Sequence, residues 1–107
     1  MKLGIVLQSN TPERVWNTFR LGIVALKADH VVQIFLMSEG SELSAVPNTE
    51  HFDIQAKVSE FTMLGGTILA CGTCLELRNT GKNNVCPVST MSDLLKMIET
   101  SDKLLVF

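Results

Sequence analysis

The sequence lacks the long apolar run, the basic patch and the signature motifs that mark several large classes of protein. No stretch of its 107 residues approaches the roughly 18 consecutive apolar residues of a membrane-spanning helix. Its 11 acidic and 9 basic residues give a net charge of −2, so nucleic acid is not expected as a direct partner. The N-terminus enters a strand-like run without signal-peptide architecture, and we therefore expect a cytoplasmic protein that binds no membrane.

Familiar catalytic and nucleotide-binding signatures are also absent. The chain has no G-x-G-x-x-G, P-loop, H-E-x-x-H or G-x-S-x-G pattern. Its 3 cysteines do not form a disulfide framework in a cytoplasmic chain, so they serve packing, metal binding or chemistry. Zinc at the one C-x-x-C pair would need two further ligands, which Cys86, His30 and His51 supply only if the fold brings them together. We predict no metal and no organic cofactor.

The composition favours one domain, residues 1–107, with a buried sheet. Hydrophobic residues make up 46% of the chain and charged residues 19%, with a mean hydropathy of +0.26, which excludes disorder. The excess of apolar over charged residues suggests that part of the surface is covered by another copy of the chain. We therefore expect a homo-oligomer.

Strand-like and helix-like segments alternate along the whole length. Apolar runs predict strands at residues 2–8, 31–37, 67–70 and 102–107, with a short strand or extended link at 85–88. Apolar spacings of three and four predict helices at residues 12–28 and 50–64, a capping box at 90–93 opens another, and residues 75–78 favour a short one. This alternation predicts an α/β fold, a three-layer α/β/α sandwich around a mostly parallel sheet of about five strands.

The stretch T-I-L-A-C-G-T-C-L-E-L-R-N at residues 67–79 carries the chemistry. It predicts a buried strand that ends at Cys71 and turns directly into the N-terminus of a helix. Ligands of open α/β sheets bind at the carboxyl ends of the strands, and the free N–H groups of a helix N-terminus stabilise a thiolate. We expect Cys71 to be a nucleophile on a rim open to partner proteins, beside the long connection at residues 38–48.

Residues 71–78, C-G-T-C-L-E-L-R, resemble the DsrE-like family of small sulfur-transfer proteins, which includes DsrE/DsrF and the TusD-type relay subunits. The stretch S-T-M-S-D-L-L at residues 89–95 and the ending S-D-K-L-L-V-F at residues 101–107 extend the resemblance over essentially the whole chain. The resemblance implies a five-stranded parallel sheet, assembly as trimers or hexamers, and a sulfur-carrying cysteine at Cys71. It also implies that sulfur arrives as a persulfide from a donor protein and passes to an acceptor protein.

The sequence thus predicts a cytosolic sulfur relay of the sulfurtransferase type, with Cys71 and Cys74 as its catalytic residues. Cys74 acts as a resolving or second sulfur-accepting thiol, or else packs the helix, and Cys86 is structural. One alternative is a binding or oligomeric subunit with a small-ligand pocket at the subunit boundary, near Cys71 and the loop at residues 38–47. Another is a dithiol redox protein that uses Cys71 and Cys74.

Overall fold

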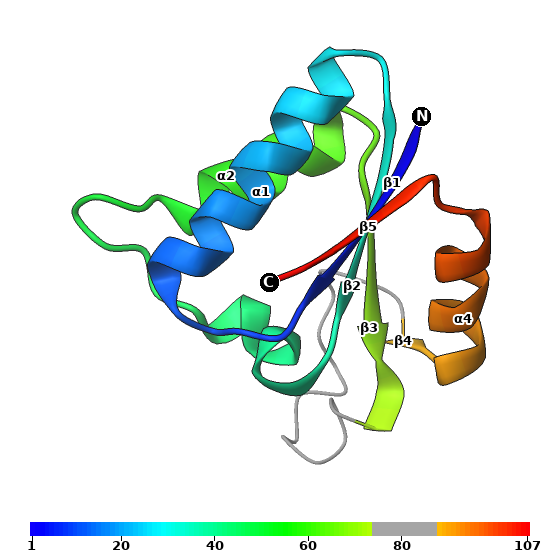
Figure 1. Cartoon of the computed structure of the whole chain (residues 1–107). Coiled ribbons are helices and arrows are strands. Elements are labelled where there is room, and N and C mark those ends of the chain that lie inside the picture. The colour runs from blue at the N-terminus through cyan, green and yellow to red at the C-terminus, as the bar shows by residue number, and fades with distance from the viewer. Residues whose placement is uncertain (74–87) are drawn as a thin grey trace.

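The chain folds around a five-stranded parallel sheet with helices on both faces (Figure 1). The structure is a computed structural model, and it describes residues 1–73 and 88–107. The strands are β1 (Lys2–Leu7), β2 (Val31–Leu36), β3 (Thr67–Cys71), β4 (Val88–Ser89) and β5 (Lys103–Val106). They lie in the order β4-β3-β2-β1-β5, and every neighbouring pair is parallel. The predicted fold class is confirmed.

Three helices of the described chain cover the two faces of this sheet. Helices α1 (Pro12–Lys27) and α2 (Ile54–Met63) lie side by side on one face, and α4 (Met91–Thr100) lies on the other (Figure 1). The larger core fills the space beneath α1 and α2, where Phe19 and Phe61 meet edge to face with ring centroids 5.4 Å apart. A smaller apolar cluster lies between the sheet and α4. The predicted short helix at residues 75–78 lies outside the described residues.

Helix α1 begins and ends close to its predicted limits because both ends carry clear signals. Its first residue is Pro12 and its first turn contains Glu13, which suits the positive end of the helix dipole. After its last turn, Asp29 adopts a left-handed conformation with φ of 67°. The N–H of Asp29 then donates to the carbonyl oxygen of Leu26 and the N–H of His30 to that of Ala25, both at 3.0 Å. These two bonds close the helix in a Schellman motif.

Helix α2 starts later than the sequence prediction, which placed its beginning at Glu50. The preceding residues form a local turn, in which Thr49 and Phe52 exchange backbone hydrogen bonds of 3.0 and 3.3 Å. Asp53 then caps the helix by accepting a hydrogen bond from the N–H of Ala56 at 3.1 Å. Its end was placed correctly, because Gly65 at φ of 95° occupies a conformation that only glycine adopts without strain.

Helix α4 opens with the predicted capping box of Thr90 and Asp93. The sequence offers four apolar residues of this helix for burial, Leu94, Leu95, Met97 and Ile98, but the structure buries fewer. Met97 is buried and Leu94 is half-buried, whereas Leu95 and Ile98 are exposed. In the described chain, α4 therefore buries only part of its apolar face.

The connection after β2 is more regular than predicted. Residues Ser38–Ala45 form a 3₁₀ helix, η1, at the carboxyl end of β2. A Cβ at Gly40 would collide with the backbone carbonyl oxygen of Leu7 at the end of β1, so only glycine permits this packing. Helix η1 is thus fixed against the same edge of the sheet that carries Cys71.

Candidate functional site

Cys71 lies where the sequence placed it, at the carboxyl end of a strand in the interior of the sheet. It is the last residue of β3, between β2 and β4, and its register partner in β4 is Ser89. The next two residues, Gly72 and Thr73, are helical, so the change from strand to helix occurs at the predicted point. Cys74, Arg78 and Cys86 lie outside the described residues.

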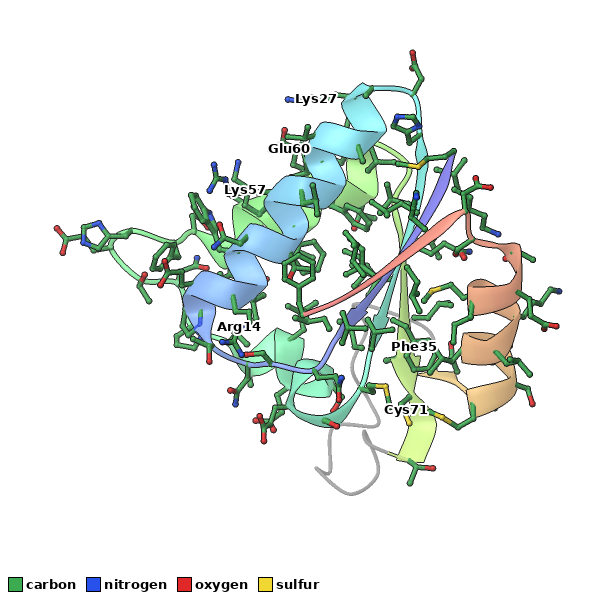
Figure 2. All side chains as sticks on the ribbon, viewed as in Figure 1. Arg14, Lys27, Phe35, Lys57, Glu60 and Cys71 are labelled. Carbon is green, nitrogen blue, oxygen red and sulfur yellow. The ribbon has the colours of Figure 1, made fainter. Side chains whose placement is uncertain are left out.

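The surroundings of the Cys71 thiol are more closed than the sequence prediction required. Its side chain is 4% exposed and belongs to an apolar cluster with Val6, Phe35 and Met97. Figure 2 shows Phe35 and Cys71 on the side of the sheet that faces α4. The expectation of a thiol open to visiting proteins is therefore wrong for this conformation, because Cys71 is buried as part of this apolar cluster.

Ser89 is a polar neighbour of Cys71 that the sequence analysis did not identify. Partners in parallel strands project to the same face of the sheet, so both side chains face α4. Ser89 is 5% exposed, and its hydroxyl forms no hydrogen bond to the chain within residues 1–73 and 88–107. Its only signal in the sequence is its place directly before the capping box of α4.

The other buried hydroxyl groups of the described chain have partners. The Ser9 hydroxyl oxygen accepts a hydrogen bond from the N–H of Thr11 at 3.0 Å. The Thr18 hydroxyl donates to the carbonyl oxygen of Arg14 at 2.9 Å, and Ser41 donates to that of Ser38 at 2.6 Å. An unpaired buried hydroxyl costs stability, so Ser89 differs from its peers in a way that suggests a missing partner.

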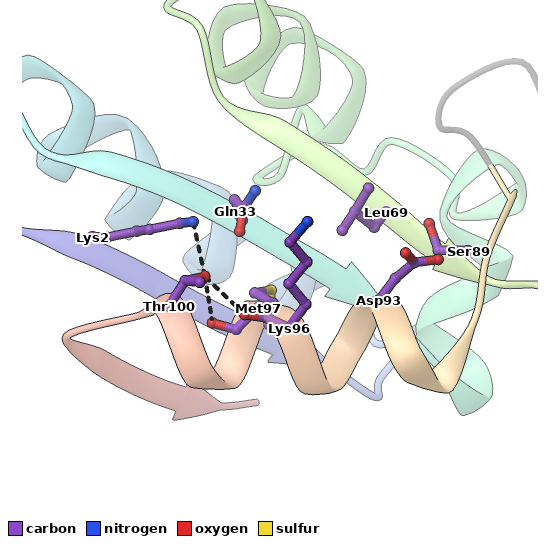
Figure 3. A pocket seen from close by; sticks show the side chains of 8 residues that line it. All are labelled: Lys2, Gln33, Leu69, Ser89, Asp93, Lys96, Met97 and Thr100. Carbon is purple, nitrogen blue, oxygen red and sulfur yellow. Dashed lines mark hydrogen bonds between the residues drawn. The ribbon is translucent and has the colours of Figure 1, made fainter.

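A pocket of about 400 Å³ begins at this point and follows the inner face of α4. Its floor is formed by Leu69 and Met97, which also belong to the apolar cluster around Cys71. Ser89 and Asp93 line one end and Lys2 and Thr100 the other, as Figure 3 shows. We call this the α4 pocket; its remaining described lining residues are Gln33 and Lys96.

Within one chain, the loop at residues 38–47 borders a hollow that is too small for an organic ligand. A hollow of about 70 Å³ lies there, lined by Asn10, Glu42 and Pro47 among others. Small-molecule sites are usually several times larger. Cys71 is not among the described residues that line it. The pocket predicted at the subunit boundary, near Cys71 and this loop, needs a second copy of the chain and stays a prediction.

The two histidines lie away from the thiol. His51 precedes α2, is exposed, and stacks edge to face on Phe52 with ring centroids 6.3 Å apart. His30 directly precedes β2, so it lies at the amino ends of the strands, whereas Cys71 lies at their carboxyl ends. The Nδ1 of His30 is 2.8 Å from the N-terminal nitrogen. Within the described parts of the chain, no three His, Cys, Asp or Glu residues cluster as metal ligands would.

Comparison with known proteins places the whole chain in one family. The model of the DsrE/DsrF-like family matches residues 1–107. The solved structure of the ychN protein from E. coli superposes with a TM-score of 0.84 at 20% sequence identity, over 100% of both chains. A conserved protein of unknown function from Bacteroides thetaiotaomicron superposes with a TM-score of 0.81 at 21% identity, over 99% of this chain and 94% of that one. No curated protein sequence matches the chain.

Proposed function

Because the chain belongs to the DsrE/DsrF-like family, we propose that it is a sulfur-relay protein that carries sulfur as a persulfide on Cys71. The observation that supports this proposal most is the position of Cys71 at the end of β3, where the chain passes directly into a helix. Backbone N–H groups at a helix start favour negative charge, which suits a thiolate or a persulfide anion.

The proposed transfer needs no cofactor, because it conserves electrons. The Cys71 thiolate attacks the outer sulfur of a donor persulfide, R–S–SH. The S–S bond of the donor breaks and R–S⁻ leaves. R–S⁻ then takes up the proton that the transferred sulfur carried, which gives R–SH and leaves the sulfur on Cys71 as Cys–S–S⁻. An acceptor thiolate then attacks this outer sulfur, which restores the Cys71 thiolate and moves the sulfur on.

Burial of the Cys71 side chain shapes this proposal. The sulfur of a cysteine residue that is only 4% exposed reacts slowly with small oxidants in bulk solvent, which protects a persulfide during storage. The same burial requires that a donor or acceptor displace the apolar neighbours before transfer. We therefore propose that transfer depends on contact with partner proteins.

Mass spectrometry of the intact chain tests the carrier role. After incubation with a small persulfide donor and removal of excess reagent, the parent should gain about 32 mass units per sulfur, and peptide mapping should place the gain on Cys71. Cys71→Ser should lose this gain, whereas Cys86→Ser should keep it. A Cys71→Ser variant that gains sulfur as well as the parent would show that the assignment is wrong.

The dithiol alternative makes a different prediction at the same residue. Mild oxidation would join Cys71 and Cys74 in a disulfide, with the loss of two alkylatable thiols and of about 2 mass units. Persulfide formation leaves the chain heavier, so one spectrum distinguishes the two reactions. A Cys74→Ser variant blocks the disulfide and leaves the persulfide on Cys71.

The burial of Cys71 favours a second candidate, a binding or oligomeric subunit without transfer activity. In that case the thiol is a packing group in the apolar cluster with Val6, Phe35 and Met97. Cys71→Ala would then leave every activity of the assembled protein unchanged and would alter stability alone.

We also propose that the chain assembles with itself, as a trimer or hexamer. Strand β5 forms an edge of the sheet, and all of its residues are exposed. Beside it, Leu21 and Val24 of α1 join Leu105 of β5 in an apolar groove of about 420 Å³, which we call the β5 groove. An unpaired edge next to exposed apolar side chains is a common site of association.

The place of action follows from the same proposal. No helix in the two described ranges is long and apolar enough to cross a membrane. We propose that the chain works in the cytoplasm and exchanges sulfur with a donor protein and an acceptor protein.

A further inference from the structure

The α4 pocket has the dimensions of a small-molecule site. Its volume of about 400 Å³ lies within the usual range for organic ligands. It extends along α4 from Asp93 to Thr100, which at the rise of an α-helix is about 10 Å. Its shape therefore suits an elongated ligand of a few carbon atoms that lies parallel to the helix.

One part of the pocket presents positive charge and hydrogen-bond donors. The Lys2 ammonium donates one hydrogen bond, to the hydroxyl oxygen of Thr100 at 2.9 Å, and forms no ion pair with a described residue. Lys96 reaches from α4 toward Gln33 on β2 (Figure 3) and forms no ion pair in the described chain, although its charge also helps to lower the pKa of Asp93, three residues earlier on α4. The Gln33 amide interrupts an otherwise apolar strand and has no hydrogen bond there either. These groups can receive an anion.

The other end of the pocket presents acceptors. Asp93 lines it, and hydrogen bonds from the N–H and hydroxyl of Thr90 hold the pKa of Asp93 below its ordinary value, so the carboxylate is charged at neutral pH. The Ser89 hydroxyl lies beside it, buried and without a partner among the described residues. A carboxylate next to a free hydroxyl suits a ligand group that carries N–H or O–H.

We propose that the α4 pocket binds a small organic acid that carries an amino or hydroxyl group at the opposite end of an apolar stem. The acid group lies near Lys2 and Lys96, and the stem rests on Leu69 and Met97. The donor group lies near Ser89 and Asp93, where it satisfies the unpaired hydroxyl. This site is separate from the proposed sulfur chemistry and does not require it, although the donor end lies next to Cys71.

Titrations of the full chain with three matched compounds test the proposal. The probe is 6-aminohexanoate, which carries both end groups; hexanoate lacks the donor and hexylamine lacks the acid. We expect 6-aminohexanoate to bind at least about threefold more tightly than either of the others, because hexanoate and hexylamine each lack one of its two charged contacts. In amide NMR spectra the shifts should centre on Gln33, Leu69 and Ser89.

Variants locate the binding. Lys96→Gln and Ser89→Ala should each weaken binding of 6-aminohexanoate by about threefold or more. Lys57→Gln removes a lysine from α2, on the opposite face of the sheet, and should bind like the parent. Cys71→Ser should also bind like the parent, so this site and the persulfide assignment can fail independently.

Three results would overturn the proposal. The first is equal affinity of the three compounds. The second is a set of shifts centred on Leu21, Val24 and Leu105, which would place binding in the β5 groove. The third is unchanged affinity in both Lys96→Gln and Ser89→Ala, with their spectra showing an intact fold.

Discussion

Cys71 and Ser89 are partners in the parallel pairing of β3 with β4, and both side chains are buried on the face that α4 covers. The pair joins a thiol in an apolar cluster to a hydroxyl at the end of the α4 pocket. Neither group has a hydrogen bond in the described chain. Two buried side chains without hydrogen bonds to the described residues therefore lie together at the end of β3, the position to which the family resemblance assigns the sulfur-carrying cysteine.

We expect Ser89→Ala to be neutral or to stabilise the protein by up to about 1 kcal/mol. The substitution removes a buried hydroxyl that has no partner in the described chain and keeps the Cβ of residue 89 with its packing contacts. The control is Ser41→Ala, which removes a buried hydroxyl bonded to the carbonyl oxygen of Ser38 and should cost about 1 kcal/mol. Urea unfolding measures both. Equal losses in the two variants would mean that Ser89 has a partner in the folded state.

The thiol of Cys71 should be protected from alkylation in the folded protein. In a Cys74→Ser, Cys86→Ser background, iodoacetamide should label Cys71 at least about tenfold more slowly without urea than in it, because the side chain must first be exposed. The rate of mass gain measures this difference. Similar rates in the two conditions would show that the sulfur is accessible in solution.

The stabilising effect of Asp93 should depend on pH. Its pKa is lowered in the folded state by hydrogen bonds from Thr90, so its contribution is present above the ordinary carboxyl range and disappears as the pH falls through the lowered value. Asp93→Asn should therefore be less stable than the parent at about pH 7, and the difference should shrink as the pH falls below the ordinary carboxyl range. The group is exposed, so added salt should reduce the difference. A constant difference in unfolding across this range would contradict the linkage.

Gly65→Ala should destabilise the protein by about 1 kcal/mol. At φ of 95°, Gly65 ends α2 in a conformation that strains a residue with a Cβ. Nothing lies within 4 Å of a Cβ built there, so the loss comes from the backbone alone. Gly65→Asn should cost less, because asparagine tolerates left-handed conformations better. Thermal unfolding measures both, and equal stability of Gly65→Ala and the parent would refute this account.

Self-association should depend on the β5 groove. Val24 is 64% exposed on α1 beside this groove, so Val24→Glu would place a charge in an interface formed there without disturbing the core. We expect sedimentation to show a smaller particle than the parent forms. Met63→Glu changes an apolar residue that is 87% exposed at the end of α2, away from the groove, and should assemble normally. Normal assembly of Val24→Glu would exclude this face.

The fold could be predicted from the sequence because buried parallel strands are apolar almost throughout. The run at residues 31–37 became β2 with a limit only one residue different, and the helix predicted at residues 12–28 became α1, which ends one residue earlier. The start of α2 was wrong for a local reason. Asn48 and Thr49 form hydrogen bonds with following backbone N–H groups, and these turns compete with helix, which propensity alone does not reveal.

The site could be predicted only in part, because position along a strand does not determine what packs over it. The sequence placed Cys71 at a strand end, and the structure confirms that position. Burial of the thiol depends on Phe35 of β2 and Met97 of α4, which are far from Cys71 in the sequence. Ser89 gained meaning only from its register with Cys71 and from the absence of a hydrogen-bond partner in the described chain.

The strand order has a consequence for how the chain is made. Strands β1 to β4 lie side by side in the order in which they are synthesised, but β5 returns about 100 residues after β1 to pair with it. Asp102, directly before β5, accepts a hydrogen bond from the Lys2 N–H at 2.6 Å. A nascent chain that has emerged only as far as α4 therefore keeps the outer hydrogen-bonding groups of β1 unsatisfied. Until residues 103–106 leave the ribosome, this unpaired edge of β1 is open to mispairing with another chain.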